Sequence, residues 1–254
     1  MIHLGTSGWS FRDWVGVFYP PGIPAGQMLN YYAARFSAVE VNSTYYRIPH
    51  PRVMAEIERK TPDGFRFTVK LNSEMTHGRT RDRNLFEEYR RALEPLEAAG
   101  KFHGALAQFP WAFQENEPNR DHLRFLRDAL GDRPLFVEFR HDSWNREEVF
   151  AFLEELKVGF CCVDEPSIQG LFPPIVRAVG EVGYVRLHGR NARDWWGRGP
   201  NRYHYLYTES ELHEWAGKIR ELEGRTREVF VFFNNCHEGG AAQNARRMGD
   251  LLGL

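Results

Sequence analysis

Polar and charged side chains stand at the ends of several short apolar runs in this chain of 254 residues. Arginine binds phosphate or carboxylate groups through paired hydrogen bonds, and lysine binds them as a point charge. Carboxylates and histidine can transfer protons near neutral pH. The run-ending residues are Asn42, Lys70, Gln108, Arg140, Asp164, His188 and Asn234. Together they predict a site that holds an anion and moves protons at it.

A second, deeper set of charges follows from the alternation of side chains along a strand. If each run is a β-strand, residues two apart share a face. Glu40 then lies on the same face as Asn42, and Glu138 on the same face as Arg140. Because an unpaired charge inside a barrel is costly, we expect Glu40, Glu138 and Arg186 to pair with one another. These three either form a satisfied polar core or take part in the chemistry.

The candidate residues divide into two roles. We predict catalytic roles for Glu138, Asp164, His188 and Lys70. The predicted substrate-binding residues are Asn42, His77, Gln108, Arg140, Arg186, Asn234, Asn235, Arg193 and Trp195. Lys70 is interpreted either as an ion-pairing lysine or, among other cations, as a Schiff-base amine.

Alternating strands and helices must position these side chains. The apolar runs are 2–7, 38–44, 66–70, 104–109, 135–140, 159–164, 184–188 and 229–235. Helical spacing is seen in 27–36, 52–60, 85–98, 120–130, 147–156, 210–222 and 241–252, with Pro95 expected to kink or shorten its helix. The Pro-rich connection 172–179 leaves a sixth helix doubtful. Eight such units predict one α/β domain over residues 1–254, a (β/α)8 TIM barrel.

Long loops follow the first, third, fourth and seventh runs, where active-site loops of such barrels lie. The loop 190–203 interleaves arginines with aromatic residues: Arg190, Arg193, Arg198 and Arg202 with Trp195, Trp196 and Tyr203. These residue types suit a surface that contacts phosphates and stacks on bases. The other interpretation is a solvated rim whose aromatic residues pack the loop down.

Composition excludes several classes of protein. Lys+Arg 33 against Asp+Glu 34 gives a net charge of −1, which indicates no partner. Three cysteines, 161, 162 and 236, are too few for a disulfide framework. The chain opens directly into a strand, and no apolar run approaches the ~20 residues of a membrane helix. We therefore expect a cytoplasmic protein that does not bind membranes. Phosphate-loop, dinucleotide and serine-nucleophile motifs are also missing from the sequence.

A divalent metal is an alternative to a site without cofactor. Glu40, Asp164, His188 and His77 offer the oxygen and nitrogen ligands that such an ion needs. The sequence contains no His-x-His or His-Glu-x-x-His pair. We therefore predict no resident cofactor, and keep the metal as the alternative.

Several motifs spread along the chain resemble one family. They include Gly5-Thr6-Ser7-Gly8-Trp9-Ser10, residues 39–46 (Val-Glu-Val-Asn-Ser-Thr-Tyr-Tyr), Thr76-His77, Gln108-Phe109-Pro110, Val137-Glu138-Phe139-Arg140-His141, Arg186-Leu187-His188-Gly189 and Phe233-Asn234-Asn235. Through them the chain resembles the DUF72, or YecE-like, proteins. The resemblance implies a TIM-barrel fold and implies no activity. Cys236 departs from the polar residue expected after the two asparagines.

Three hypotheses for function remain open from the sequence. The first is an enzyme that hydrolyses phosphoesters of a small anionic substrate, a nucleotide or nucleic acid. The second is a binding module that holds nucleic acid or an anionic metabolite without chemistry, through contacts that weaken with salt. The third is a glycosidase, which needs two carboxylates at a suitable separation, such as Glu40 and Glu138.

Overall fold

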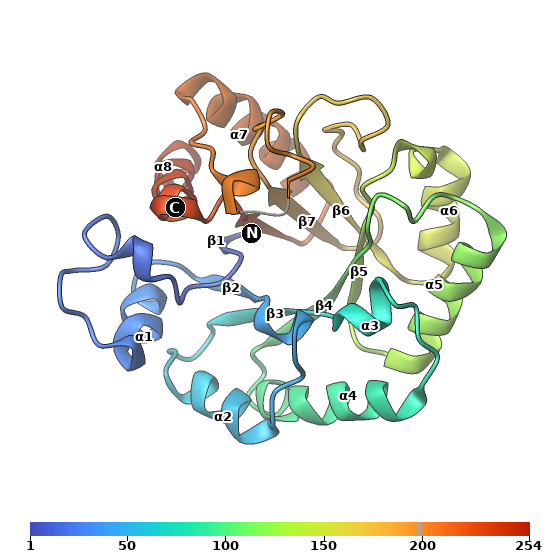
Figure 1. Cartoon of the computed structure of the whole chain (residues 1–254), viewed down its shortest axis with the longest axis horizontal. Helices are drawn as coiled ribbons and strands as arrows, with labels where there is room; N and C mark the ends of the chain where they lie inside the picture. The colour runs from blue at the N-terminus through green and yellow to red at the C-terminus, as the bar shows by residue number, and fades with distance from the viewer. Residues whose placement is uncertain (198–199) are drawn as a thin grey trace.

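A parallel sheet of eight strands, wrapped into a barrel and surrounded by helices, makes up the fold (Figure 1). The computed structural model describes residues 1–197 and 200–254. Its strands are β1 (Ile2–Thr6), β2 (Ala38–Val41), β3 (Arg66–Lys70), β4 (Phe102–Gln108), β5 (Leu135–Glu138), β6 (Gly159–Asp164), β7 (Val182–Leu187) and β8 (Glu228–Phe233). The strand order is β1-β8-β7-β6-β5-β4-β3-β2, and every pairing is parallel. The predicted (β/α)8 TIM barrel is confirmed.

Helices cover the outside of the sheet. They are α1 (Met28–Ala33), α2 (Pro51–Arg59), α3 (Ser73–Thr76), α4 (Arg83–Ala98), α5 (Glu117–Leu130), α6 (Glu147–Glu155), α7 (Glu209–Glu223) and α8 (Gly240–Leu252). Side chains cap several of them; the Thr208 hydroxyl and the Glu211 carboxylate form a capping box at the start of α7. In the described residues, no helix is both long and apolar enough to cross a membrane.

Two expectations about the helices meet different outcomes. Residues 165–181, all of them described, contain no helix, as the Pro-rich connection indicated. Of the two outcomes expected at Pro95, a kink or a shortened helix, the shortened helix is wrong, because α4 continues to Ala98. Pro95 lies in the last turn of α4, where buried Leu93 and Leu96 hold the helix against the barrel and only one backbone donor is lost.

The barrel closes between β1 and β2 through a side chain. The backbone bridge that joins them is a single pair, Ser7 with Glu40. The buried Tyr32 hydroxyl accepts a hydrogen bond from the Thr6 N–H (2.8 Å) and donates one to the Ala38 carbonyl (3.0 Å). A Cβ atom at Gly5 would lie 2.0 Å from the Ala38 oxygen, so only glycine allows this close approach. Closure brings the carboxyl ends of β1 and β2 beside those of the other strands.

Polar side chains, instead of the usual Val, Ile and Leu layers, fill the upper half of the interior. The Tyr184 hydroxyl lies 2.9 Å from the Thr68 hydroxyl and donates to Glu40 at 2.6 Å. Above these three side chains lie Glu138 and Arg186, both buried. The core of the barrel is therefore a polar platform on which the mouth is built.

Candidate functional site

A cavity of about 360 Å³ opens among residues that follow or end the strands, at the carboxyl end of the barrel. Its lining combines cations, amides and aromatic rings: Asn42, Tyr45, Tyr46, Lys70, His77, Gln108, Pro110, Trp111, Arg140, Leu171, Arg186, Trp195, Trp196, Arg202, Tyr203 and Asn234. No carboxylate belongs to this lining, so the described wall of the pocket is cationic. We call this cavity the mouth pocket.

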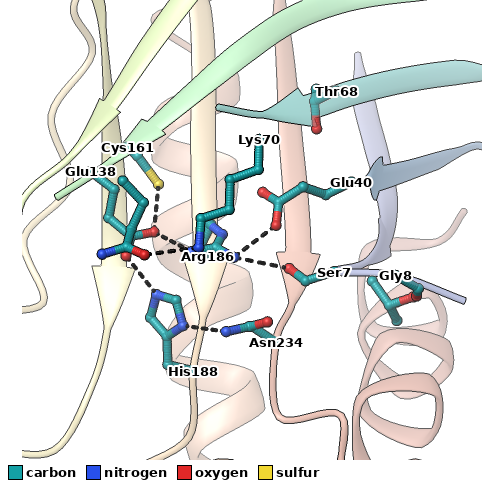
Figure 2. Close-up of polar contacts among 12 residues, drawn as sticks. Ser7, Gly8, Glu40, Thr68, Lys70, Glu138, Cys161, Arg186, His188 and Asn234 are labelled. Carbon is teal, nitrogen blue, oxygen red and sulfur yellow. Dashed lines mark hydrogen bonds and ion pairs between the residues drawn. The ribbon is translucent and has the colours of Figure 1, made fainter. Parts of the chain in front are cut away.

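The floor of the mouth pocket is a buried ion network (Figure 2). Arg186 donates to Glu40 Oε1 at 2.7 Å and to Glu138 Oε2 at 2.5 Å. Figure 2 shows the Arg186 guanidinium between the two carboxylates, with Ser7 beside it. The predicted mutual pairing of Glu40, Glu138 and Arg186 is confirmed. Such a triad stabilises the interior only while all of its members are present.

Arg140 connects this network to the wall of the mouth pocket. Its Nε lies 2.7 Å from Glu138 Oε1, and its Nη1 donates to Glu165 Oε2 at 2.6 Å. Its Nη2 lies 3.1 Å from His188 Nε2, and its guanidinium carbon is 5.3 Å from the centre of a Trp195 ring. Arg140 is thus a rigid cation, fixed from several sides, that presents part of its guanidinium to the cavity.

Glu138 and His188 are poorly suited to proton transfer. Burial alone would raise the pKa of Glu138, but the guanidiniums of Arg140 and Arg186 hold that pKa well below its usual range. Burial, together with Arg140, lowers the pKa of His188 well below 6.5. His188 is completely buried, and its Nδ1 lies 2.9 Å from Asn234 Nδ2. Both side chains keep one protonation state near neutral pH and act by positioning Arg140 and Asn234.

Lys70 is different, because the partners shown for its amine are uncharged. Lys70 Nζ donates to Gln108 Oε1 at 2.9 Å and lies 4.3 Å from the centre of the Tyr45 ring. Burial, and then the nearby charge of Arg186, lower the pKa of Lys70 to about 7. Burial, followed by the charges of Lys70 and Arg140, lowers the pKa of His77 to about 4. A titratable amine and a neutral imidazole therefore share the wall of the cavity.

Aromatic rings form another part of the wall. Trp195 is completely buried, with the Arg202 guanidinium carbon 4.3 Å from its ring centre. Trp111 packs edge-on against Trp196 at 5.7 Å between ring centres. Its Nε1 donates to the Gly170 carbonyl, which fixes the ring. A flat ring or a sugar face can stack on such a wall while an anionic group reaches the cations.

Five buried polar atoms of lining residues have no hydrogen-bond partner among the described residues: Asn42 Oδ1, Arg140 Nε, Arg186 Nε, Trp195 Nε1 and Arg202 Nε. The two arginines of the floor are still compensated by charge, because Arg140 and Arg186 form ion pairs with Glu138. Buried polar groups are otherwise paired in nearly all cases, because an unpaired one costs free energy. Arg202 and Trp195 offer donors, and Asn42 offers an acceptor. This combination suits a ligand that carries both an anionic group and a hydroxyl or amino group.

Asp164, for which a catalytic role was predicted, neither faces the barrel interior nor lines the mouth pocket. Cys161 faces inward, with its sulfur 4.0 Å from Glu138 Oε2, and alternation along β6 therefore turns Asp164 outward. The buried Asp164 carboxylate accepts hydrogen bonds from Arg190 and from the Tyr207 hydroxyl. It anchors the loop after β7. Glu165, which sequence reasoning missed, takes the inward position and pairs with Arg140.

Other predicted ligand residues also lie away from the cavity. Asn235 donates to the Tyr205 carbonyl and to Asn244 Oδ1, so it joins the loop before α7 to α8. Arg193 is exposed and does not belong to the lining. Arg198 lies outside the described residues. The lining adds Tyr45, Tyr46 and Trp111, which were not singled out as ligand residues although the first two stand in the conspicuous motif 39–46.

The four residues considered as metal ligands are not brought together. The Glu40 carboxylate is occupied by Arg186 and Tyr184, and Asp164 by Arg190 and Tyr207. His77 lines the cavity, but these two carboxylates do not. The set therefore does not form one coordination site.

The fold and the mouth pocket define a class: a closed parallel barrel with a cationic, aromatic cavity at the carboxyl ends of its strands. A family model described as "Protein of unknown function DUF72" matches residues 3–254, and the chain belongs to this family. The UPF0759 protein YunF of Bacillus subtilis is 33% identical over 272 residues, covering 100% of this chain and 95% of that protein.

Solved structures agree with this assignment. A DUF72 family protein from Thermotoga maritima superposes with a TM-score of 0.93 at 41% identity and full coverage of both chains. Another from Enterococcus faecalis gives a TM-score of 0.90 at 27% identity, covering 100% of this chain and 96% of that one. The resemblance seen in the sequence motifs is confirmed.

Proposed function

We propose that the mouth pocket binds a small phosphorylated molecule and that the protein hydrolyses its phosphoester bond. One observation carries the proposal: Lys70 and Arg202 face the cavity without a carboxylate partner among the described residues, above a floor whose other charges pair internally. Cations held this way favour an anion, and phosphate oxygens match their donors. The aromatic wall takes the organic part of the substrate.

The proton-handling groups are Lys70 and His77. His77 Nδ1 lies 3.0 Å from the Thr76 hydroxyl, which leaves Nε2 as the nitrogen to serve the cavity. In the proposed step, a water oxygen attacks phosphorus and gives one proton to His77 as the ester P–O bond breaks. The leaving oxygen takes a proton from Lys70, whose protonated form the bound anion favours. Arg140 and Arg202 stabilise the charge on the phosphoryl oxygens.

Turnover of aryl phosphomonoesters and phosphodiesters tests this proposal. We expect hydrolysis that is lost in Lys70→Met and in His77→Gln and that is preserved in Arg225→Met, at the opposite end of the barrel. The kcat/KM profile should fall at low pH through the His77 pKa of about 4 and at high pH through the Lys70 pKa of about 7. Full activity in both pocket variants would overturn the assignment.

A binding module without chemistry is the second candidate, favoured because Glu138 and His188 are fully engaged with other side chains. In this case nucleic acid or an anionic metabolite would bind at the mouth and along the basic loop 190–203. Binding should then weaken steeply with salt and on neutralising Arg193 or Arg198, with no product formed. Binding that is insensitive to salt would exclude this candidate.

A further inference from the structure

A second group of potential ligands lies on the rim of the barrel, outside the mouth pocket. His204 precedes α7, and His237 and Glu238 belong to η6 (His237–Gly239), which follows β8. One ligand atom from each of the three lies within 4.8 Å of the others. We propose that His204, His237 and Glu238 bind a divalent transition-metal ion, with zinc as the reference ion.

The distances suit such an ion. His204 Nε2 lies 3.2 Å from Glu238 Oε2, and His237 Nε2 lies 4.0 Å from Glu238 Oε1. Ligand atoms about 2.0–2.1 Å from a tetrahedral zinc ion are separated by about 3.4 Å. The three ligand atoms, all within 4.8 Å of one another, are therefore spaced close to the separations around a common metal centre. Two imidazoles and one carboxylate are the ligand set of open zinc sites, and they suit Co²⁺ and Ni²⁺ as well.

Neighbouring groups support this geometry. Asp13 Oδ2 accepts a hydrogen bond from the Glu238 N–H at 2.7 Å, which holds Glu238 at a φ of 53°, unusual for a residue other than glycine. The same Asp13 oxygen lies 3.9 Å from Nδ1 of His237, whereas the other ring nitrogen, Nε2, is the one near Glu238. A carboxylate behind the second nitrogen of a ligating histidine is a common way to fix its orientation.

The charge of the cluster also favours a cation. In the described part of the chain, the ion-pair partners of Asp13 and Glu238 are these two histidines, and neither carboxylate pairs with a lysine or arginine. The side chains of His204 and Glu238 are 52% and 65% exposed, so a fourth coordination position faces solvent. A bound ion would join the loops that precede α7 and α8, beside Tyr203 of the mouth pocket.

Calorimetric titration of the untagged full chain with zinc chloride tests the site. We expect uptake of one ion per chain, an affinity at least tenfold weaker in His204→Gln and in His237→Gln, and weaker by about 10–100-fold in Asp13→Asn. The matched control is His213→Gln, because His213 and Glu209 form an exposed pair at 3.4 Å without a second histidine. This control should bind zinc as the parent does.

Cobalt provides an independent readout. Cobalt chloride should give visible ligand-field bands with the parent chain and not with the His204 variant. Failure of the parent to take up one zinc ion, or an unchanged affinity in both the His204 and the His237 variants, would overturn the proposal. Because the replaced side chains are at least 27% exposed and keep a polar group, urea unfolding in the absence of metal should match the parent. The test does not depend on phosphoester turnover.

Discussion

Removing the cation at the centre of the buried network is the most demanding test of the barrel interior. Arg186 is 1% exposed and contacts Glu40 and Glu138 at 2.7 and 2.5 Å. In Arg186→Met, Glu138 keeps Arg140 and His188, whereas Glu40 keeps, among the described residues, only the Tyr184 hydroxyl at 2.6 Å. The variant therefore strands a buried carboxylate.

The magnitude follows from this geometry. Two unit charges about 4 Å apart interact by about 4 kcal/mol at an effective dielectric of 20, and removing one partner of a buried pair costs about 3–5 kcal/mol. We expect Arg186→Met to lose about 3–5 kcal/mol of unfolding free energy in urea, a large part of the ~5–15 kcal/mol typical of a domain. Adding Glu40→Gln removes the stranded charge, so the double variant should be more stable than Arg186→Met alone.

Arg186→Met should also make the protein less stable at acid pH. Arg140 and Arg186 hold the pKa of Glu138 well below its usual range, against the effect of burial. The ionised Glu138 carboxylate therefore contributes to folding stability above its unfolded-state pKa, and this contribution is lost as pH falls through its folded-state pKa. Without Arg186 the folded-state pKa rises, so unfolding, followed by circular dichroism, should begin at a higher pH.

Arg124→Met, on the surface of α5, is the control and should leave stability close to that of the parent. A loss below about 1 kcal/mol in Arg186→Met, within the range of exposed pairs, or a double variant less stable than Arg186→Met, would refute this reasoning.

Three further predictions concern the pocket and its supports. Lys70 should react with an amine-directed reagent with a midpoint near pH 7, measured by peptide mass spectrometry; a midpoint near the ordinary ~10.4 would contradict its placement. Asp164→Asn should accelerate proteolysis within residues 189–207, because Arg190 loses its buried charged partner and keeps the more exposed Glu211 and Glu214, and unchanged cleavage would exclude that role. Tyr32→Phe should cost about 1–3 kcal/mol in urea, since two backbone groups at the β1–β2 closure lose their partner. An unchanged midpoint would show that the hydroxyl is not needed.

The sequence was sufficient for the fold because each unit carries its own periodicity and the order of units determines a parallel barrel. It also located Lys70, Arg140 and Asn234 in the lining, since strand ends meet at one face. The orientation of Asp164 was out of reach, because the apolar run 159–163 gives no polar contrast between its two faces. Cys161 and Cys162 are neighbours with equivalent side chains, so the sequence does not show which of them points into the barrel. The structure decides this, because the Cys161 sulfur lies against the buried Glu138 carboxylate.

Loop contributions were harder to predict for a different reason. Trp195 and Arg202 reach the cavity through contacts within one long loop, whereas Arg193 of the same loop remains exposed. Nothing in their spacing distinguishes them, because no regular element fixes the direction of these side chains. The rim cluster was equally hidden: His204 and His237 are 33 positions apart and meet only when the loops after β7 and β8 come together.

Binding of phenylphosphonate, a phosphoester analogue that resists hydrolysis, tests the central claim most directly. Calorimetry at low salt should show one molecule bound per chain, with affinity reduced about 10–100-fold in Lys70→Met and in Arg202→Met, because each loses a charged contact of about 1.5–3 kcal/mol. Arg225→Met should bind as the parent does. Phenol, which lacks the anion, should bind far more weakly. Equal affinity of the parent and both pocket variants, or equal affinity for phenol, would contradict an anion site at the barrel mouth.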